Sequence, residues 1–241
     1  MSIDVKGNII SSSKLTSTGV FKTTIVRDSL ILHLDAANQD SYPGSGIVWY
    51  DLSGNGANLS TNGSPSWTTL GGRTAFNLTA DGDYFSGGIS NFPTTELTLE
   101  AWLYPAASEI TAGDRGAVIL ANGGSGAYMS WNKSSQYMSD YWYGHAPEGY
   151  HEQVGPSSRS NWHHWCCVWD NKSVYQWVDG VYGTVNGVSG SSASNTNIWI
   201  GREGSSRQFS GGFAIIRIYS RALNPYEVAQ NFQAQRGRFG L

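Results

Sequence analysis

The chain has 241 residues, a formal net charge of -3 and 14% charged residues, well below the roughly 25% of ordinary soluble domains. This balance excludes a basic nucleic-acid-binding surface and a polybasic membrane-binding segment, and no apolar run approaches the roughly 20 residues of a membrane span. Thirty glycines and an aromatic content of 13% favour short strands and turns over amphipathic helices, so the composition predicts an all-β protein.

Residues 1–28 differ from the rest of the chain, because they contain neither Trp nor Tyr and few large apolar residues. The segment shows no signal-peptide pattern, and its alternation over Gly19–Val26 predicts one or two strands that need a partner surface. Two interpretations are open. The segment is either a terminal strand or disordered tail of the domain, or an arm that pairs with a neighbouring subunit.

From Leu30 onward, short apolar or alternating runs recur between turn clusters, and no helical crossover separates them. This pattern predicts one antiparallel sandwich over residues 29–241. The clearest predicted strands are Leu30–Leu34, Leu97–Leu103, Ala117–Leu120, His164–Trp169, Val174–Val178, Ile198–Ile200 and Phe213–Tyr219.

Two local signals are specific. Asp179-Gly180 predicts a type I′ hairpin turn, because both residues tolerate a positive φ. Near the C-terminus, Asn224, Pro225 and Glu227 predict a helix start with a capping box, and Gly237 is expected to end that helix.

Cys166 and Cys167 are adjacent, so in a strand their side chains point to opposite faces and an unstrained mutual disulfide is excluded. We therefore expect two reduced thiols, one of them buried. They do not form a metal site, because zinc needs more ligands at other spacings.

Several motifs occur in an order that resembles the laminin-G-like branch of the concanavalin A-like lectin/glucanase jelly rolls. The resemblance implies a two-sheet antiparallel jelly-roll sandwich, to which the sequence adds an N-terminal extended arm and a short C-terminal helix. The matching segments are His33–Ala36, Trp49–Gly56, Leu99–Trp102, Asn161–His164, Trp177–Gly180, Ile200–Arg202 and Arg217–Leu223.

Two pieces of the sequence resemble a narrower group. Leu34–Ala36 with Ser41–Gly46, and the ending Gln230–Gly240, are similar to versions found in tailed-phage structural proteins. The resemblance implies a virion component made in the bacterial host cytoplasm, as a capsid decoration, neck or tail protein. Residues 1–28 would then anchor it to other virion proteins, and we expect a homo-oligomer, with a trimer as the working choice.

The same resemblance raises the question of catalysis. Jelly-roll glucanases carry a Glu-x-Asp-x-x-Glu strand, and retaining glycoside hydrolysis needs two carboxyl groups about 5–5.5 Å apart. The nearest match is Glu96–Glu100, where Thr98 takes the place of the middle acid. We therefore predict a structural role for Glu100 and no enzymatic activity. The alternative, a glycoside hydrolase or depolymerase, would need a second acid beside Glu100 or another pair such as Glu148 and Glu152.

Aromatic residues concentrate over residues 128–151, interleaved with amides and carboxylates. Aromatic faces stack on the apolar faces of sugars while polar groups bind the hydroxyls, so this region predicts a site for host-surface glycans. Aromatic rings also fill the core of a sandwich. The competing interpretation is therefore a scaffold that binds no sugar. The candidate sugar-binding residues are Trp131, Tyr141, Trp142, Tyr143, His145 and Tyr150.

The resemblance implies one candidate cofactor, calcium, because laminin-G-like jelly rolls often hold one ion through loop oxygens. Against it, Ala214 stands where many relatives have an Asp, and turns and caps explain loop aspartates without any metal. The candidate ligands are Asp35, Asp51, Asp81 and Asp83.

Overall fold

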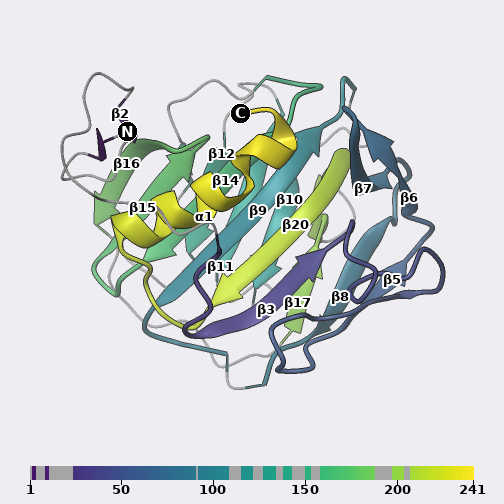
Figure 1. The fold of residues 1–241 in the computed structure, drawn as a ribbon, viewed down its shortest axis with the longest axis horizontal. Helices are drawn as coiled ribbons and strands as arrows, with labels where there is room; N and C mark the ends of the chain where they lie inside the picture. The colour runs from purple at the N-terminus through teal and green to yellow at the C-terminus, as the bar shows by residue number, and fades with distance from the viewer. Residues whose placement is uncertain are drawn as a thin grey trace.

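Two antiparallel sheets pack face to face, and helix α1 (Pro225–Phe239) lies across the outer face of one of them (Figure 1). We call this sheet the helix-side sheet and the other the far sheet. The computed structural model describes residues 2–3, 9–10, 24–90, 92–108, 115–121, 127–133, 138–142, 150–152, 158–187, 197–203 and 207–241. The all-β, two-sheet sandwich with one C-terminal helix is therefore confirmed.

The helix-side sheet has β9 and β20 at its centre, and β3 pairs with β20 alongside β7. Its strands, in spatial order, are β16 (Val181–Gly187), β15 (Ser173–Val178), β14 (His163–Trp169), β9 (Leu97–Pro105), β20 (Gly211–Tyr219), β7 (Arg73–Leu78) and β6 (Ser66–Leu70), with β3 (Leu30–Asp35).

The far sheet has β10 and β17 at its centre, and two short strands join it beside β10. Its strands are β13 (Tyr150–Glu152), β12 (Met138–Trp142), β11 (Ala127–Asn132), β10 (Arg115–Ala121), β17 (Asn197–Ile200), β8 (Tyr84–Gly88), β5 (Leu59–Asn62) and β4 (Val48–Trp49), with β19 (Arg207–Gln208) and β18 (Arg202–Glu203). A separate pair is formed by β1 (Ser2–Ile3) and β2 (Ile9–Ile10).

The hydrophobic core fills the space between the sheets, where side chains from alternate positions of each strand meet. Trp49, Phe76 and Phe85 pack at its centre with ring centroids 4.8 to 5.0 Å apart, at tilted or edge-on angles. The large apolar side chains of the sequence are therefore used mainly to hold the two layers together.

The central strands of the helix-side sheet are buried on both faces, because α1 covers their outer face. The outer side chain of Trp102 stacks on Phe239 at 4.1 Å and on Phe232 at 5.9 Å between ring centroids. All seven residues of β14 are buried for the same reason. Cys166 and Cys167 are free and both buried, one on each face, whereas the sequence predicted burial of only one.

The predicted hairpin and helix start are confirmed. Asp179 and Gly180 have φ values of 51° and 78° at the β15–β16 turn, and Asn224 and Glu227 form a complete capping box. The predicted helix end at Gly237 is wrong. The helix continues to Phe239 because that ring still packs on Trp102, and Gly240 ends it in the left-handed conformation with φ 79°.

A cluster of polar side chains lies under α1, fully enclosed between the helix and the sheet. Arg217 Nη1 donates to Glu100 Oε1 at 2.7 Å, and His164 Nε2 lies 3.0 Å from the same oxygen. Asn231 of α1 donates to Glu100 Oε2 at 2.8 Å. Since a carboxylate only accepts hydrogen bonds, His164 Nε2 must carry the proton in this contact.

The ionised form of Glu100 is strongly stabilised in this cluster. Burial raises the pKa of the Glu100 carboxyl, but the Arg217 guanidinium and then the hydrogen bond from His164 outweigh burial and lower the pKa to about 2. Burial, followed by the positive charge of Arg217, lowers the pKa of neighbouring His33 to about 3, so this imidazole is neutral at physiological pH.

The cluster also holds residues 24–28, the segment before β3, against the domain. Val26 donates its amide to Asn231 Oδ1 at 2.8 Å, and its carbonyl accepts from the Tyr219 hydroxyl at 3.1 Å. Gln230 donates to the carbonyl of Thr24, and Arg221 pairs with Asp28. The sequence placed the boundary between the arm and the sandwich after residue 28. In the structure residues 24–28 already pack against the sandwich, so the boundary lies earlier in the chain. No helix formed by the described residues is long and apolar enough to cross a membrane.

Replacing Asn231 with Ala should lower the free energy of unfolding by about 3 kcal/mol, because it removes a buried partner of the Glu100 carboxylate and of the Val26 amide together. Urea unfolding measures the loss. Gln230→Ala is the matched control on the same helix, since that side chain makes one exposed bond to Thr24. Equal losses in the two variants would contradict the importance assigned to the cluster.

The protein should lose stability as the pH falls below about 6.5, because unfolded His33 then takes up a proton that the folded chain excludes until about pH 3. Glu100 adds to this loss below its ordinary pKa of 4.5. His163 acts in the opposite direction, since its hydrogen bond to the Asp179 carboxylate outweighs burial and raises the pKa of His163. Urea midpoints of wild type and His33→Leu across this range isolate the first effect. An unchanged pH dependence in the variant would contradict it.

Candidate functional site

The pairing register of the far sheet lines up aromatic residues in one row across five strands. Tyr150 of β13 pairs with Tyr141 of β12, which pairs with Tyr128 of β11. Tyr128 pairs with Leu120 of β10, and Leu120 pairs with Trp199 of β17. Because directly opposed residues share one face of a sheet, these five positions lie on the same face.

This face is the outer one, turned away from the core. The residues that alternate with the row, namely Met129, Ile119 and Ile200, belong to the hydrophobic core between the sheets. Trp199 itself is half-buried, as expected for a ring on an outer face. The register therefore places four aromatic positions in one row on the outer side of the far sheet.

At the Trp199 end of the row, polar groups lie beside the aromatic rings. Trp199 meets Tyr84 of β8 edge-on at 6.5 Å between ring centroids, and the Arg202 guanidinium lies 5.5 Å above the Tyr84 ring. Arg202 also lies 3.8 Å from the Asp81 carboxylate. The result is an aromatic platform with a charged pair at its rim. We call Tyr84, Trp199 and Arg202 the platform residues.

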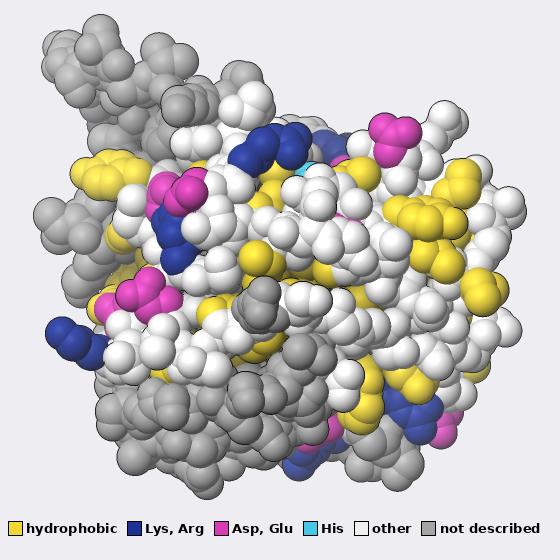
Figure 2. Space-filling model, turned by 90° about the horizontal axis from the view of Figure 1, so that it is seen from below, with side chains coloured by type: hydrophobic (Ala, Val, Ile, Leu, Met, Phe, Trp, Pro, Cys, Tyr) yellow, Lys and Arg dark blue, Asp and Glu magenta, His cyan; other side chains and the backbone are white. Residues whose placement is uncertain are grey.

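Amide and hydroxyl groups continue this face beyond Trp199. Ser86 is its register partner on β8, and Asn62 donates to the Ser86 hydroxyl at 2.9 Å. Figure 2, which views the sandwich from its lower edge, shows that the described surface there is likewise mostly uncharged, with a few Lys, Arg, Asp and Glu side chains among polar and hydrophobic ones. Such a surface suits a ligand that offers hydroxyl groups and apolar ring faces.

The structure places the predicted sugar-binding residues on different faces of the far sheet. Tyr141 and Tyr150 hold adjacent positions in the aromatic row. Trp142 pairs with Ala127, a core residue that is 1% exposed, so its position falls on the core side of the sheet. Tyr143 and His145 lie outside the described residues.

Trp131 was predicted wrongly as a sugar-binding residue. Its side chain is 1% exposed and packs in the core, and the Arg159 guanidinium lies 5.8 Å from its ring. A buried ring has no face on which a sugar can stack. The position shares the core side of β11 with Met129, two residues earlier.

Sequence reasoning missed Trp199 and Tyr84 because both stand outside the aromatic-rich stretch. A signal was nevertheless present. Trp199 lies between Ile198 and Ile200, and strict alternation in a strand puts the tryptophan on the face opposite to two core isoleucines.

Glu100 has the predicted structural role. It shares one side of β9 with Thr98, whose hydroxyl accepts from the Leu223 amide and donates to the Arg221 carbonyl. Glu96, just before β9, accepts from the Ala222 amide. The segment that resembled a glucanase strand therefore holds the connection from β20 to α1, and the fully buried Glu100 cannot reach a polysaccharide.

The four candidate calcium ligands do not assemble into a site. Asp51 accepts from the amides of His33, Ser53 and Ala57, while Asp83 accepts from those of Ser64, Thr79 and Ala80. Asp35 pairs with Arg238, and Asp81 lies beside Arg202. No group of three or more His, Cys, Asp or Glu among the described residues could hold a metal ion. These aspartates instead stabilise turns and fix the end of α1.

Comparison with known proteins agrees with this architecture. The sequence profile described as the concanavalin A-like lectin/glucanases superfamily, of the laminin-G type, matches residues 78–229. A search among curated proteins finds no match.

Among solved structures, the receptor binding domain of botulinum neurotoxin D superposes with a TM-score of 0.65 at 14% identity, covering 87% of this chain and 53% of that one. Domain 4 of AbnA, an arabinanase from Geobacillus stearothermophilus solved with arabinotriose, gives 0.63 at 16% identity and coverages of 86% and 98%. The Trypanosoma rangeli sialidase gives 0.62 at 15% identity and coverages of 86% and 33%.

The chain thus spans about half of the neurotoxin chain and a third of the sialidase chain. At these identities the likeness concerns the fold alone. The sequence match, which covers most of the sandwich, shows the family: the chain belongs to the concanavalin A-like lectin/glucanases superfamily.

Proposed function

We propose that this protein is a non-catalytic carbohydrate-binding domain whose ligand lies across the outer face of the far sheet. The observation that carries the proposal is the row of Tyr150, Tyr141, Tyr128 and Trp199 positions, which ends at the platform residues. Aromatic faces stack on the C–H faces of sugar rings, and the neighbouring amide, hydroxyl and guanidinium groups can bind sugar hydroxyls.

One structural neighbour, domain 4 of AbnA, supports this choice of ligand because it was solved with arabinotriose. A second neighbour, the neurotoxin receptor binding domain, is also a binding domain. Both share the two-layer fold with this chain.

The proposal that the domain is non-catalytic is supported by the position of Glu100 under α1. Of the alternative acid pair, Glu152 takes an outer-face position through its register partner Ser139, and Glu148 lies outside the described residues. A glycoside hydrolase would need Glu152 and a second carboxylate on this face. Retention of full polysaccharide chain length after prolonged incubation is the expected result for a binding domain.

We further propose that the domain is displayed on a tailed-phage virion as a homo-oligomer, anchored to other virion proteins by residues 1–28. The docking of residues 24–28 supports this orientation, because Val26 and Thr24 are fixed on the helix side of the sandwich. An anchor on that side would leave the far sheet turned outward. Many displayed copies would make weak glycan contacts effective through avidity.

Replacing Trp199 or Tyr84 with Ala should weaken glycan binding about tenfold each, which corresponds to the loss of about 1.4 kcal/mol of stacking free energy. A glycan array followed by calorimetry with the strongest ligand provides the measurement. Trp67→Ala is the matched control, because Trp67 is an exposed aromatic residue (44%) on β6 of the other sheet. Equal affinity for Trp199→Ala and Trp67→Ala would contradict the proposed face.

Deletion of residues 1–23 should abolish co-sedimentation with phage particles stripped of this protein while leaving the melting temperature nearly unchanged. The deletion keeps Thr24 and Val26, which hold the domain side of the segment. Co-sedimentation of both forms to the same extent would show that the sandwich itself makes the virion contact.

A further inference from the structure

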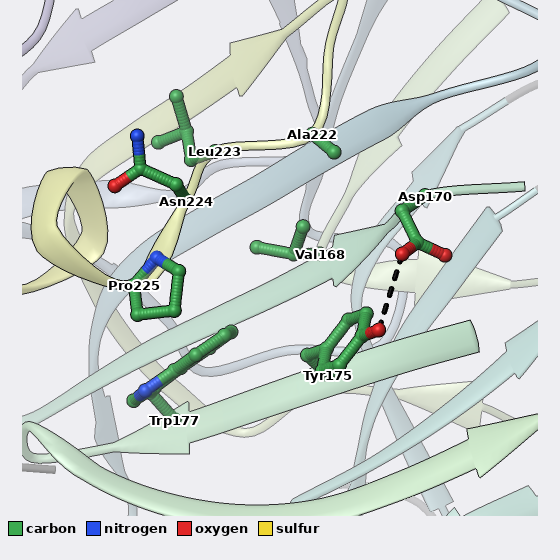
Figure 3. Close-up of a pocket in the computed structure, with 8 residues that line it drawn as sticks. All are labelled: Val168, Asp170, Tyr175, Trp177, Ala222, Leu223, Asn224 and Pro225. Carbon is green, nitrogen blue, oxygen red and sulfur yellow. Dashed lines mark hydrogen bonds between the residues drawn. The ribbon is translucent and has the colours of Figure 1, made fainter. Parts of the chain in front are cut away.

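A pocket lies on the opposite layer of the sandwich, where α1 begins. It has a volume of about 310 Å³ and is lined by β14, β15 and the connection from β20 to α1 (Figure 3). Ligand pockets typically have volumes of about 300–1,000 Å³, so this one is large enough for a single ring-sized group. The lining residues are Val168, Asp170, Tyr175, Trp177, Ala222, Leu223, Asn224 and Pro225.

The inner wall of this pocket is apolar. Val168, Trp177 and Leu223 are each at most 3% exposed and form its floor, with Pro225 at one side. Tyr175 is half-buried and lies nearly parallel to Trp177, with 6.4 Å between ring centroids and an interplanar angle of 28°. The floor itself is almost closed to solvent, so contacts to the C–H groups of a ligand come from the partly buried Tyr175, Ala222 and Pro225.

One end of the pocket is polar and accepts hydrogen bonds. The Tyr175 hydroxyl donates to Asp170 Oδ2 at 3.1 Å, while Asp170 Oδ1 accepts from the amides of Lys172 and Ser173. A carboxylate has about four lone-pair positions, so this set leaves one on Oδ2 beside the Tyr175 oxygen. Burial, and then the Asp170 carboxylate, raise the pKa of Tyr175, so the phenol stays protonated in that contact.

The charge of the pocket restricts the ligand further. None of the lining residues is Lys, Arg or His, so the Asp170 carboxylate would repel an anionic ligand. The amides of Tyr226 and Glu227 at the start of α1 already donate to Asn224 Oδ1, so they are not available to an anion. A neutral group that donates hydrogen bonds through hydroxyls and presents apolar C–H faces fits these constraints.

We propose that this pocket is a second carbohydrate site, which binds one uncharged sugar residue and excludes uronic and sialic acids. The choice of a sugar rests on the proposed function, whereas the pocket itself is independent of the far face. The two sites would lie on opposite layers of the sandwich, so a single chain could hold two glycan strands and cross-link them.

The pocket can be closed without touching the far sheet. Ala222 lines it and is only partly buried, so Ala222→Phe should fill the cavity while the Ala222 amide keeps its bond to Glu96. Tyr226→Ala is the matched control, because Tyr226 is a neighbouring residue of α1 that is 66% exposed and does not line the pocket.

The test is an amide and indole NMR titration of the full-length protein with maltotriose, cellotriose and arabinotriose, and separately with sialyllactose and trigalacturonate. At least one neutral trisaccharide should shift the amides of Asp170 and Leu223. These shifts should persist in Trp199→Ala and Tyr226→Ala and disappear in Ala222→Phe, and the anionic sugars should produce none.

The two proposals can fail separately in this experiment. Shifts of the Trp199 indole without shifts at Asp170 and Leu223 would overturn the second site and leave the far face standing. Shifts at the pocket alone would overturn the far face. Equal shifts from anionic sugars, or a melting temperature changed by Ala222→Phe without any effect on saccharide shifts, would overturn the pocket as an uncharged-sugar site.

Discussion

The ion pair between Glu100 and Arg217 is the contact on which the arrangement of the outer layers depends. Both side chains are fully buried, and their charges are compensated only while Asn231 of α1 and His164 of β14 stay in place. The helix therefore cannot leave the sheet without exposing an incompletely compensated carboxylate. The same asparagine holds Val26, so the helix and the chain before β3 are fixed together.

This arrangement gives the two sheets different roles. The central strands of the helix-side sheet are covered on both faces, and a cavity lies at the start of α1. The far sheet faces the core on one side, and its outer face carries the aromatic row. A buried ion pair contributes little net stability compared with apolar packing, but it fixes one geometry, and here that geometry decides which face is left for a ligand.

The sequence was a good guide wherever the signal was local. The β15–β16 turn needs two adjacent residues with positive φ, and the capping box needs Asn224 and Glu227 three positions apart, so both were predictable. Alternation within a strand also predicted that Thr98 and Glu100 share a side. Family motifs added the layer architecture that alternation alone does not specify.

The site was less predictable because its residues meet only through long-range pairing. Trp199 joins the row through β10, about 80 residues earlier in the chain, and Glu100 finds Arg217 across 117 positions. A dense aromatic stretch does not reveal which rings face the core. Trp131 was therefore included as a sugar-binding residue and Trp199 was missed. In the structure Trp131 of β11 faces the core, whereas Trp199 of β17 lies on the outer face.

The central claim is that a glycan lies across the outer face of the far sheet. A crystal structure of the protein with the neutral oligosaccharide that binds best in the array tests this most directly. We predict a sugar ring stacked on Trp199 or Tyr84, with the chain running over β10, β11 and β12. A saccharide bound only at the loops that join the two sheets, with the aromatic row left bare, would contradict the account.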